Sequence, residues 1–312
     1  MLNKLYYFFV LILGLIIFLP IFGIFNKIEL NLLYLFEFIQ SKYNLRLVYI
    51  TFLQAFLSSL ISCVLALPFA ISLFRRKKKL VNRILISLSG YSFVLPSILI
   101  VYSVIGIFGT NGVLNKTTNL YNLFNIKTIF GLQGILVAHI LLNTPFAVRI
   151  FVQNLNSIPK KYVEVAKSMN FSFWQNYLYL EWPIIRQNFF SIFSIIFILC
   201  FLSVAIVMAL GGGPRYSTLE VAIYQSIFFE LDFNKAIILS IIQIVICSFL
   251  LIAGFLSLKG SNYYDIQTDN FEYLFNKNKL ISLIDFLIIV IFSLFFFSPI
   301  LFYFNKIFTK YY

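Results

Sequence analysis

The chain has 312 residues, of which 61% are hydrophobic and only 11% are charged. A soluble domain contains roughly 45 to 50% apolar and about 25% charged residues, so this composition excludes an ordinary soluble protein. The formal net charge is +13, but the Lys and Arg residues lie between apolar runs and not along one face, which argues against nucleic-acid binding. Lipid is therefore the expected solvent for most of the chain.

Seven apolar runs are each long enough to cross a hydrocarbon core, which needs about 20 helical residues. Membrane barrel strands would instead alternate polar and apolar residues in segments of about ten, so these runs predict helices and an all-α polytopic membrane protein. The first run has no small-residue cleavage site after it, and we expect it to stay as an anchor. The runs lie at residues 5–25, 47–74, 84–108, 132–155, 189–211, 235–258 and 281–304.

Lys and Arg are concentrated in two of the loops between these runs. One loop follows the second run, at residues 75–83, and the other lies between the fourth and fifth runs, from Lys160 to Arg186. Short loops rich in these residues face the cytoplasm. Lys4 and Lys259 agree with this orientation, so seven crossings predict a cytoplasmic N-terminus and a periplasmic C-terminus.

The composition divides the chain into four parts. Residues 259–280 are polar, have no sustained apolar period and are typical of a cytoplasmic linker. The expected organisation is an N-terminal anchor span with an external segment at 1–46, a core at 47–258 that contains a loop at 158–183, the linker at 259–280, and an extra span with a short external tail at 281–312.

The loop at residues 158–183 has the pattern of two short helices. Val163, Ala166 and Met169 recur at three-residue intervals and give the first helix one apolar face. Such a face is typical of a helix that docks in a groove of a partner and also of a helix that lies in the lipid interface. Periodicity alone leaves both interpretations open.

The expected ends of these two helices are marked by local signals. Asn170 suits the left-handed residue that often ends a helix, since Asn is the second choice there after Gly. Ser172 and Gln175 have the capping-box spacing that starts a second helix. We expect Pro183 to close that second helix.

The same loop resembles the cytoplasmic motif of binding-protein-dependent ABC importer permeases. That motif contains Glu-Ala-Ala, then Gly, and then Ile, any residue and Leu-Pro. The spacing matches throughout, while Val165, Asn170 and Trp182 replace the motif's Ala, Gly and Leu. The matching positions are Glu164, Val165, Ala166, Asn170, Leu180, Trp182 and Pro183.

This resemblance implies a function in transport. The family uses the loop as a coupling helix that docks in a cleft of a cytoplasmic ABC ATPase subunit. The chain is then expected to be a permease subunit in a bacterial inner membrane, with a six-span core and one additional C-terminal span. A periplasmic substrate-binding protein and a complementary permease half are the other implied partners. No P-loop is present in the sequence, so ATP would be hydrolysed by the partner subunit; we expect neither enzyme activity nor a cofactor.

One subfamily is especially similar. The segments GLQGILVAHILLNTPFAVRI, LEWP and LGGGPRYSTLEVAIYQ resemble the front half of the thiamine importer permease, over about residues 130–258. Iron(III) importer permeases are the alternative, and a membrane scaffold without transport activity is the alternative outside this class. Both importer types are fused permeases with two halves, so the complementary half would come from a second copy or a separate chain, or be lost.

Polar side chains inside the spans are candidates for the translocation path, because they are costly in lipid and usually face a bundle interior or a cavity. For the single histidine, the default interpretation is a packed, hydrogen-bonded residue inside the membrane. The candidates are Gln54, His139, Asn143, Ser203 and Gln243.

Two further features are expected to be structural. Cys63, Cys200 and Cys247 lie in apolar runs without paired spacing, which indicates packing residues and neither a disulfide nor a metal site. Residues 211–213 are three glycines followed by proline, but no Gly-Lys-Ser/Thr follows them. They therefore predict the end of a helix and not a phosphate-binding loop.

Overall fold

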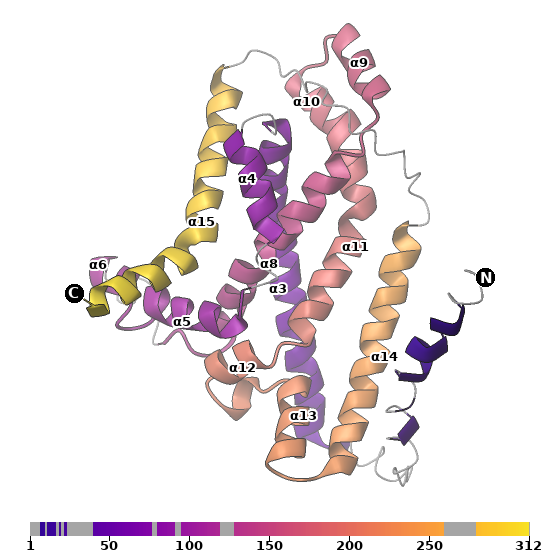
Figure 1. Ribbon diagram of the computed structural model, residues 1–312, viewed down its shortest axis with the longest axis vertical. Coiled ribbons are helices and arrows are strands. Elements are labelled where there is room, and N and C mark those ends of the chain that lie inside the picture. Colours follow the sequence, from indigo (N-terminus) through magenta and orange to yellow (C-terminus); the bar gives the residue numbers. More distant parts are fainter. Residues whose placement is uncertain are drawn as a thin grey trace.

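The computed structural model describes residues 40–76, 80–90, 95–118, 128–258 and 279–311, with shorter pieces between residues 7 and 23. The regular elements of this described part are all helical, and Figure 1 shows them as an elongated bundle. Their bounds are α3 Lys42–Arg75, α4 Leu80–Ser89, α5 Ser97–Phe108, α6 Val113–Thr118, α8 Leu132–Leu155, α9 Lys160–Ser168, α10 Phe173–Asn176, a π-helical turn Tyr177–Glu181, α11 Trp182–Phe201, α12 Ala205–Leu210, a 3-10 turn Pro214–Tyr216, α13 Leu219–Phe228, α14 Phe233–Leu258 and α15 Lys279–Tyr311.

Six helical stretches of the described part are long and apolar enough to cross a membrane. They confirm the predicted fold class, an all-α polytopic membrane protein. The predicted first span at 5–25 is described only in short helical pieces, and most of the linker at 259–280 lies outside the described residues. The six stretches are Lys42–Arg75, Ser97–Asn115, Leu132–Leu155, Phe173–Phe201, Phe233–Ser257 and Lys279–Tyr303.

The predicted third span, 84–108, is divided between two helices. Only α5 belongs to the membrane span, whereas α4 is a separate short helix that ends at Ser89. Pro96 precedes α5 with a non-helical ψ of 131°. Proline lacks the N–H that a helix needs and disfavours the helical conformation of the residue before it, here Leu95. Hydropathy does not register such a break, which is why one run appeared as one span.

The predicted fifth span, 189–211, has different bounds in the structure. The observed span begins at Phe173, within the segment that we expected to be a loop, and its helix ends at Phe201. Residues 202–204 separate it from the short helix α12. The apolar run therefore continues past the point where the helix stops.

The glycine run after α12 ends a helix, as predicted. α12 stops at Leu210, and Gly212 and Gly213 follow with φ of 69° and 107°. These left-handed values favour glycine because a Cβ would clash with the backbone. The Leu210 carbonyl accepts a hydrogen bond from the N–H of Gly131 at 2.7 Å, so the helix end is joined to the chain just before α8.

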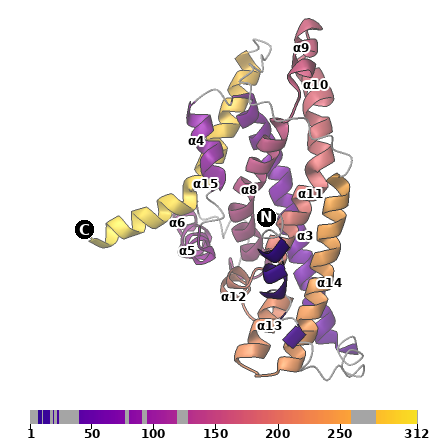
Figure 2. The ribbon, with the colours of Figure 1, turned by 45° about the vertical axis from the view of Figure 1, so that its right-hand side comes forward.

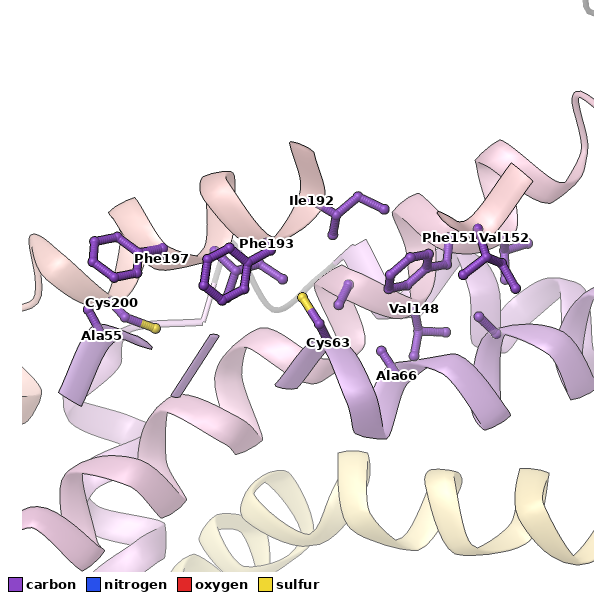
Figure 3. Close-up of a cluster of buried hydrophobic side chains, with 14 of the residues drawn as sticks. Ala55, Cys63, Ala66, Val148, Phe151, Val152, Ile192, Phe193, Phe197 and Cys200 are labelled. Carbon is purple, nitrogen blue, oxygen red and sulfur yellow. The ribbon is translucent and has the colours of Figure 1, made fainter. Parts of the chain in front are cut away.

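The core of the bundle lies where α3, α8 and α11 pack together. Figure 3 shows small side chains of α3, among them Ala55, Cys63 and Ala66, next to larger side chains of the other two helices. Lipid tails are as apolar as the side chains, so membrane helices associate through close packing, and small residues let their backbones approach. Cys63 and Cys200 are both buried in this core and act as packing residues.

The two ends of the bundle carry different short helices. α9 and α10 project at one end, here called the α9 end, whereas α12 and α13 lie toward the opposite end, the α13 end (Figure 1).

α15 lies along α3 and α5. Figure 2 shows α15 turning away from the bundle toward its C-terminal end, and it contains Pro299, which interrupts the helical hydrogen bonds. The Ser103 hydroxyl of α5 donates to the Pro299 carbonyl at 3.0 Å. The predicted short tail is helical as far as Tyr311.

Candidate functional site: the 158–183 segment

The first helix of the 158–183 segment, α9, forms as predicted over Lys160–Ser168. Pro159 precedes it in an extended conformation, which is the usual backbone conformation of the residue just before a helix. Val163 belongs to the main apolar core together with Leu155 at the end of α8 and Ile158 shortly after it. α9 is therefore held against the bundle by its own apolar residues.

The orientation of α9 differs from the expected single apolar face. Val163 and Ala166 are both only 4% exposed and point inward, whereas Met169 is 65% exposed. Met169 lies just beyond the last helical residue, so it does not continue the inward stripe. Tyr162 and Val165 are also exposed, and with Met169 they form a second apolar face, the outer face of α9 (Tyr162, Val165, Met169). The side of α9 that faces outward is therefore this outer face and not the face of Val163 and Ala166.

The turn after α9 confirms the prediction for Asn170. Its φ is 50°, one of the few left-handed non-glycine values in the described chain. The Phe171 N–H donates to the Ala166 carbonyl at 3.0 Å, and the Asn170 N–H donates to the Lys167 carbonyl at 3.0 Å. This pair of bonds is the Schellman motif, which satisfies the last carbonyls of a helix. Asn170 thereby fills the position where the family motif has glycine.

The second helix of the segment begins with the predicted capping box. The Gln175 N–H donates to the Ser172 hydroxyl at 3.4 Å, and the Ser172 N–H donates to the Gln175 side-chain oxygen at 2.7 Å. Two backbone donors at the start of α10 are thus satisfied reciprocally. Together the two caps give the turn between α9 and α10 a defined geometry.

The prediction that Pro183 closes this second helix is wrong. The helix passes without a break from α10 through the π-helical turn Tyr177–Glu181 into α11. A proline inside an α-helix removes one hydrogen bond and clashes with the carbonyl four residues before it. In the wider π turn the Trp182 N–H donates to the Tyr177 carbonyl, five residues back, and this spacing lets the helix continue through Pro183. α10 is therefore continuous with a membrane span.

A buried ion pair joins this π turn to α3. The guanidinium of Arg75 donates to both carboxylate oxygens of Glu181 at 2.8 and 2.7 Å. Neither side chain is exposed beyond 2%. The Arg75 guanidinium also lies 4.2 Å from the centre of the Phe173 ring, at the start of α10. Arg75 belongs to the basic loop predicted at residues 75–83, and the signal that could have revealed its partner is an acid, Glu181, between the apolar Leu180 and Trp182.

Residues 60–261 match the family described as the binding-protein-dependent transport system inner membrane component. The match covers more than half of the chain and includes the whole 158–183 segment. The chain belongs to this family.

Relatives of this permease include proteins named thiamine transport system permease protein ThiP. The protein of Haemophilus influenzae is 38% identical over 261 residues, which make up 83% of this chain and 48% of that protein. The protein of Escherichia coli is 35% identical over 209 residues, 67% of this chain and 39% of that protein. The chain thus spans about half the length, or less, of the curated relatives it matches.

Solved structures show the same permease fold. A bacterial ABC transporter involved in the import of the acidic polysaccharide alginate has a chain with a TM-score of 0.61 and 14% identity, covering 82% of this chain and 96% of that chain. A bacterial alginate ABC transporter in complex with a periplasmic protein gives a TM-score of 0.60 and 14% identity, covering 80% and 92%. At this identity the likeness establishes the fold alone.

The motif positions of this permease differ in their exposure. Glu164 and Val165 are exposed on α9, and Glu164 lies 3.9 Å from Lys160 in an exposed ion pair. Ala166 is buried, and Asn170 forms the turn. Leu180 is half-buried, whereas Trp182 and Pro183 are exposed at the start of α11.

Three of the five polar candidates inside the spans line one cavity of the permease. The cavity has a volume of about 240 Å³ and lies where α11 gives way to α12, beside the start of α5. His139 and Asn143 of α8 and Ser203 of the α11–α12 link contribute to its wall. The other two candidates lie elsewhere: Gln54 donates to the Cys200 carbonyl at 2.9 Å within the core, and Gln243 of α14 donates to Glu220 of α13.

Proposed function

We propose that this chain is half of an ATP-driven importer permease and that its 158–183 segment docks on an ATP-hydrolysing partner subunit. The observation that carries the proposal is the outer face of α9, which is apolar and exposed and is joined through the Asn170 turn to a helix that continues into a membrane span. An exposed apolar face on a short helix is typical of a helix that docks in a groove of a partner. ATP-driven closure of the partner would move α9 and, through the continuous α10–α11 helix, the membrane span itself.

The distribution of charge supports an α9 end that faces the cytoplasm. Arg75, Arg76, Lys160, Lys161 and Lys167 lie at this end. The α13 end carries Glu220, Glu230 and Asp232 with fewer cations. Lys and Arg favour the cytoplasmic side of membrane proteins. The C-terminal end of α15 would then be periplasmic, and the α13 end would meet a periplasmic substrate-binding protein.

The proposed substrate is thiamine, and its support is the identity to the ThiP relatives. In a strain that lacks this chain, uptake of radiolabelled thiamine is expected to fall to background, while uptake of radiolabelled iron(III) stays unchanged. A plasmid copy should restore thiamine uptake. Loss of iron uptake instead would favour the iron(III) alternative, and loss of neither would favour a scaffold without transport activity.

A complementary permease half completes the proposed assembly. The chain spans about half of its relatives, and α14 presents exposed apolar residues such as Ile244, Val245, Phe249 and Phe255 along its length. Lipid covers such a surface where no protein does, and a second permease half needs a surface of this kind. A second copy of this chain would bring a second α9 to the partner ATPase, whereas a separate chain would bring its own docking segment.

The cavity lined by His139, Asn143 and Ser203 is the proposed part of the translocation path. Replacing Ser203 by phenylalanine would fill much of its 240 Å³. We expect thiamine uptake to fall by roughly tenfold, because passage depends on the free diameter of the path. Ser257→Phe on α14, at another half-buried position outside the cavity, is the matched control. Equal uptake by both variants would contradict this assignment.

A further inference from the structure

Four charged side chains gather at the α9 end of the bundle, from three helices far apart in the sequence. This charge cluster consists of Arg75 and Arg76 at the end of α3, Glu181 in the π-helical turn, and Asp285 in the first turns of α15. Besides the bidentate Arg75–Glu181 pair, Asp285 lies 4.0 Å from Arg75 Nη1 and 4.0 Å from Arg76 Nε. Two positive and two negative charges make the cluster neutral, so removing any one of them leaves an uncompensated charge.

Burial of the cluster indicates a role beyond stability. The exposed fractions of the Arg75, Glu181 and Asp285 side chains are 2%, 0% and 9%. Taking charges out of water costs free energy that their attraction repays only in part, and apolar residues of similar volume often stabilise a core as well or better. What a charge cluster adds to apolar packing is that its hydrogen bonds fix the relative positions of the groups they join.

The contacts of the charge cluster position three helices relative to one another. Arg75 contacts both ends of the short stretch that links α9 to α11, since its guanidinium lies over Phe173 and pairs with Glu181. On its other side the cluster reaches α15. The Ser72 hydroxyl donates to Asp285 at 3.2 Å, and the Arg76 guanidinium donates to the hydroxyl and carbonyl oxygens of Ser282. The end of α3 is thus bonded to the base of the 158–183 segment and to the beginning of α15.

We propose that the charge cluster is a joint that makes α15 move together with the 158–183 segment, and that Arg75 is its positioning residue. α15 begins at Lys279, beyond the residues 60–261 that match the family, so this joint would connect an additional span to the family core. The joint itself rests only on the contacts of this chain. Its part in transport rests on the proposed docking of an ATPase at α9.

Distances between spin labels on α9 and α15 test the joint directly. Lys161 and Leu280 are exposed on these two helices and are suitable label sites after replacement by cysteine, with Cys63, Cys200 and Cys247 changed to alanine. For the full chain in lipid nanodiscs, double electron–electron resonance should give one narrow distribution of the distance between the two labels. This measurement requires neither an ATPase nor a substrate.

Neutralising the acids of the cluster should loosen α15 from α9. Asp285→Asn removes the charge that binds α15 and retains the Arg75–Glu181 pair, whereas Glu181→Gln removes the charge that binds the segment. In each variant we expect the label distribution to become about twofold broader or to split. Glu230→Gln is the matched control, because it neutralises an exposed carboxylate paired with Lys235 at the α13 end. Unchanged distributions in both cluster variants would overturn the proposal.

Transport kinetics separate a joint from a purely structural contact. Asp285→Asn should lower the maximal rate of thiamine uptake by about tenfold, within the usual range of coupling effects, and leave its KM and the recovery of the ATPase subunit unchanged. A purely structural role would instead lower the amount of folded chain and leave the rate per folded chain unaltered, which overturns the joint. If the unsubstituted chain takes up no thiamine, the proposed function fails, while the spin-label result still decides whether the joint exists.

Discussion

Replacing Val165 with aspartate is expected to abolish the recovery of an ATPase subunit with this chain. Val165 is 53% exposed and lies between Tyr162 and Met169 on the outer face of α9. A carboxylate there would have to lose its water in an apolar groove without a partner. Disrupting a central interface residue costs about 2 to 4 kcal/mol, which weakens binding by roughly 30-fold to about 1000-fold.

The measurement is affinity purification of a tagged chain from its own membranes, with the P-loop subunit identified by mass spectrometry. Phe229→Asp is the matched control, because it places the same charge on an exposed aromatic position at the α13 end. Ala166→Asp is less informative: Ala166 is buried, so this variant would disturb the packing of α9 itself. If Val165→Asp and Phe229→Asp recover equal amounts of the subunit, α9 is not the docking helix.

Replacing Arg75 with methionine is expected to destabilise the chain strongly. The variant leaves the fully buried Glu181 carboxylate without its bidentate partner. Removing one member of a buried ion pair costs about 3 to 5 kcal/mol, because the remaining charge stays buried without compensation. Lys235→Met, which breaks an exposed pair with Glu230, should cost at most about 1 kcal/mol. Thermal unfolding of the purified variants in one detergent measures the difference as a shift in Tm.

The double variant Arg75→Met/Glu181→Leu separates the effect of the lost charge on stability from the effect of the changed packing. It removes both members of the pair and should recover most of the lost Tm, since apolar residues of similar volume often replace a buried pair without loss. Its α9–α15 distance distribution should nevertheless stay broad, because Asp285 would still lack the Arg75 guanidinium. A shift in Tm for Arg75→Met no larger than that for Lys235→Met would show that the pair is not desolvated.

Local signals predicted the elements of the 158–183 segment well. The turn at Asn170 and the capping box at Ser172 and Gln175 both form, because each depends on hydrogen bonds between residues at most five apart. The spans were recognised from their apolar length alone. The ends of the spans were not recognised, since Pro96 and residues 202–204 interrupt helices inside apolar runs. Pro183 is accommodated by a π turn that the local sequence does not predict.

The sequence by itself determined that this chain is an all-α membrane protein of the importer permease family, because apolar run length and motif spacing are properties of neighbouring residues. Only the tertiary structure decided which apolar face of α9 is exposed. Val163 turns inward into the core that contains the end of α8, Ala166 is buried on the same side, and Val165 is left outside. The partners of Arg75 were also decided by the fold: Glu181 is 106 residues away in sequence, and only helix packing brings the two together with Asp285.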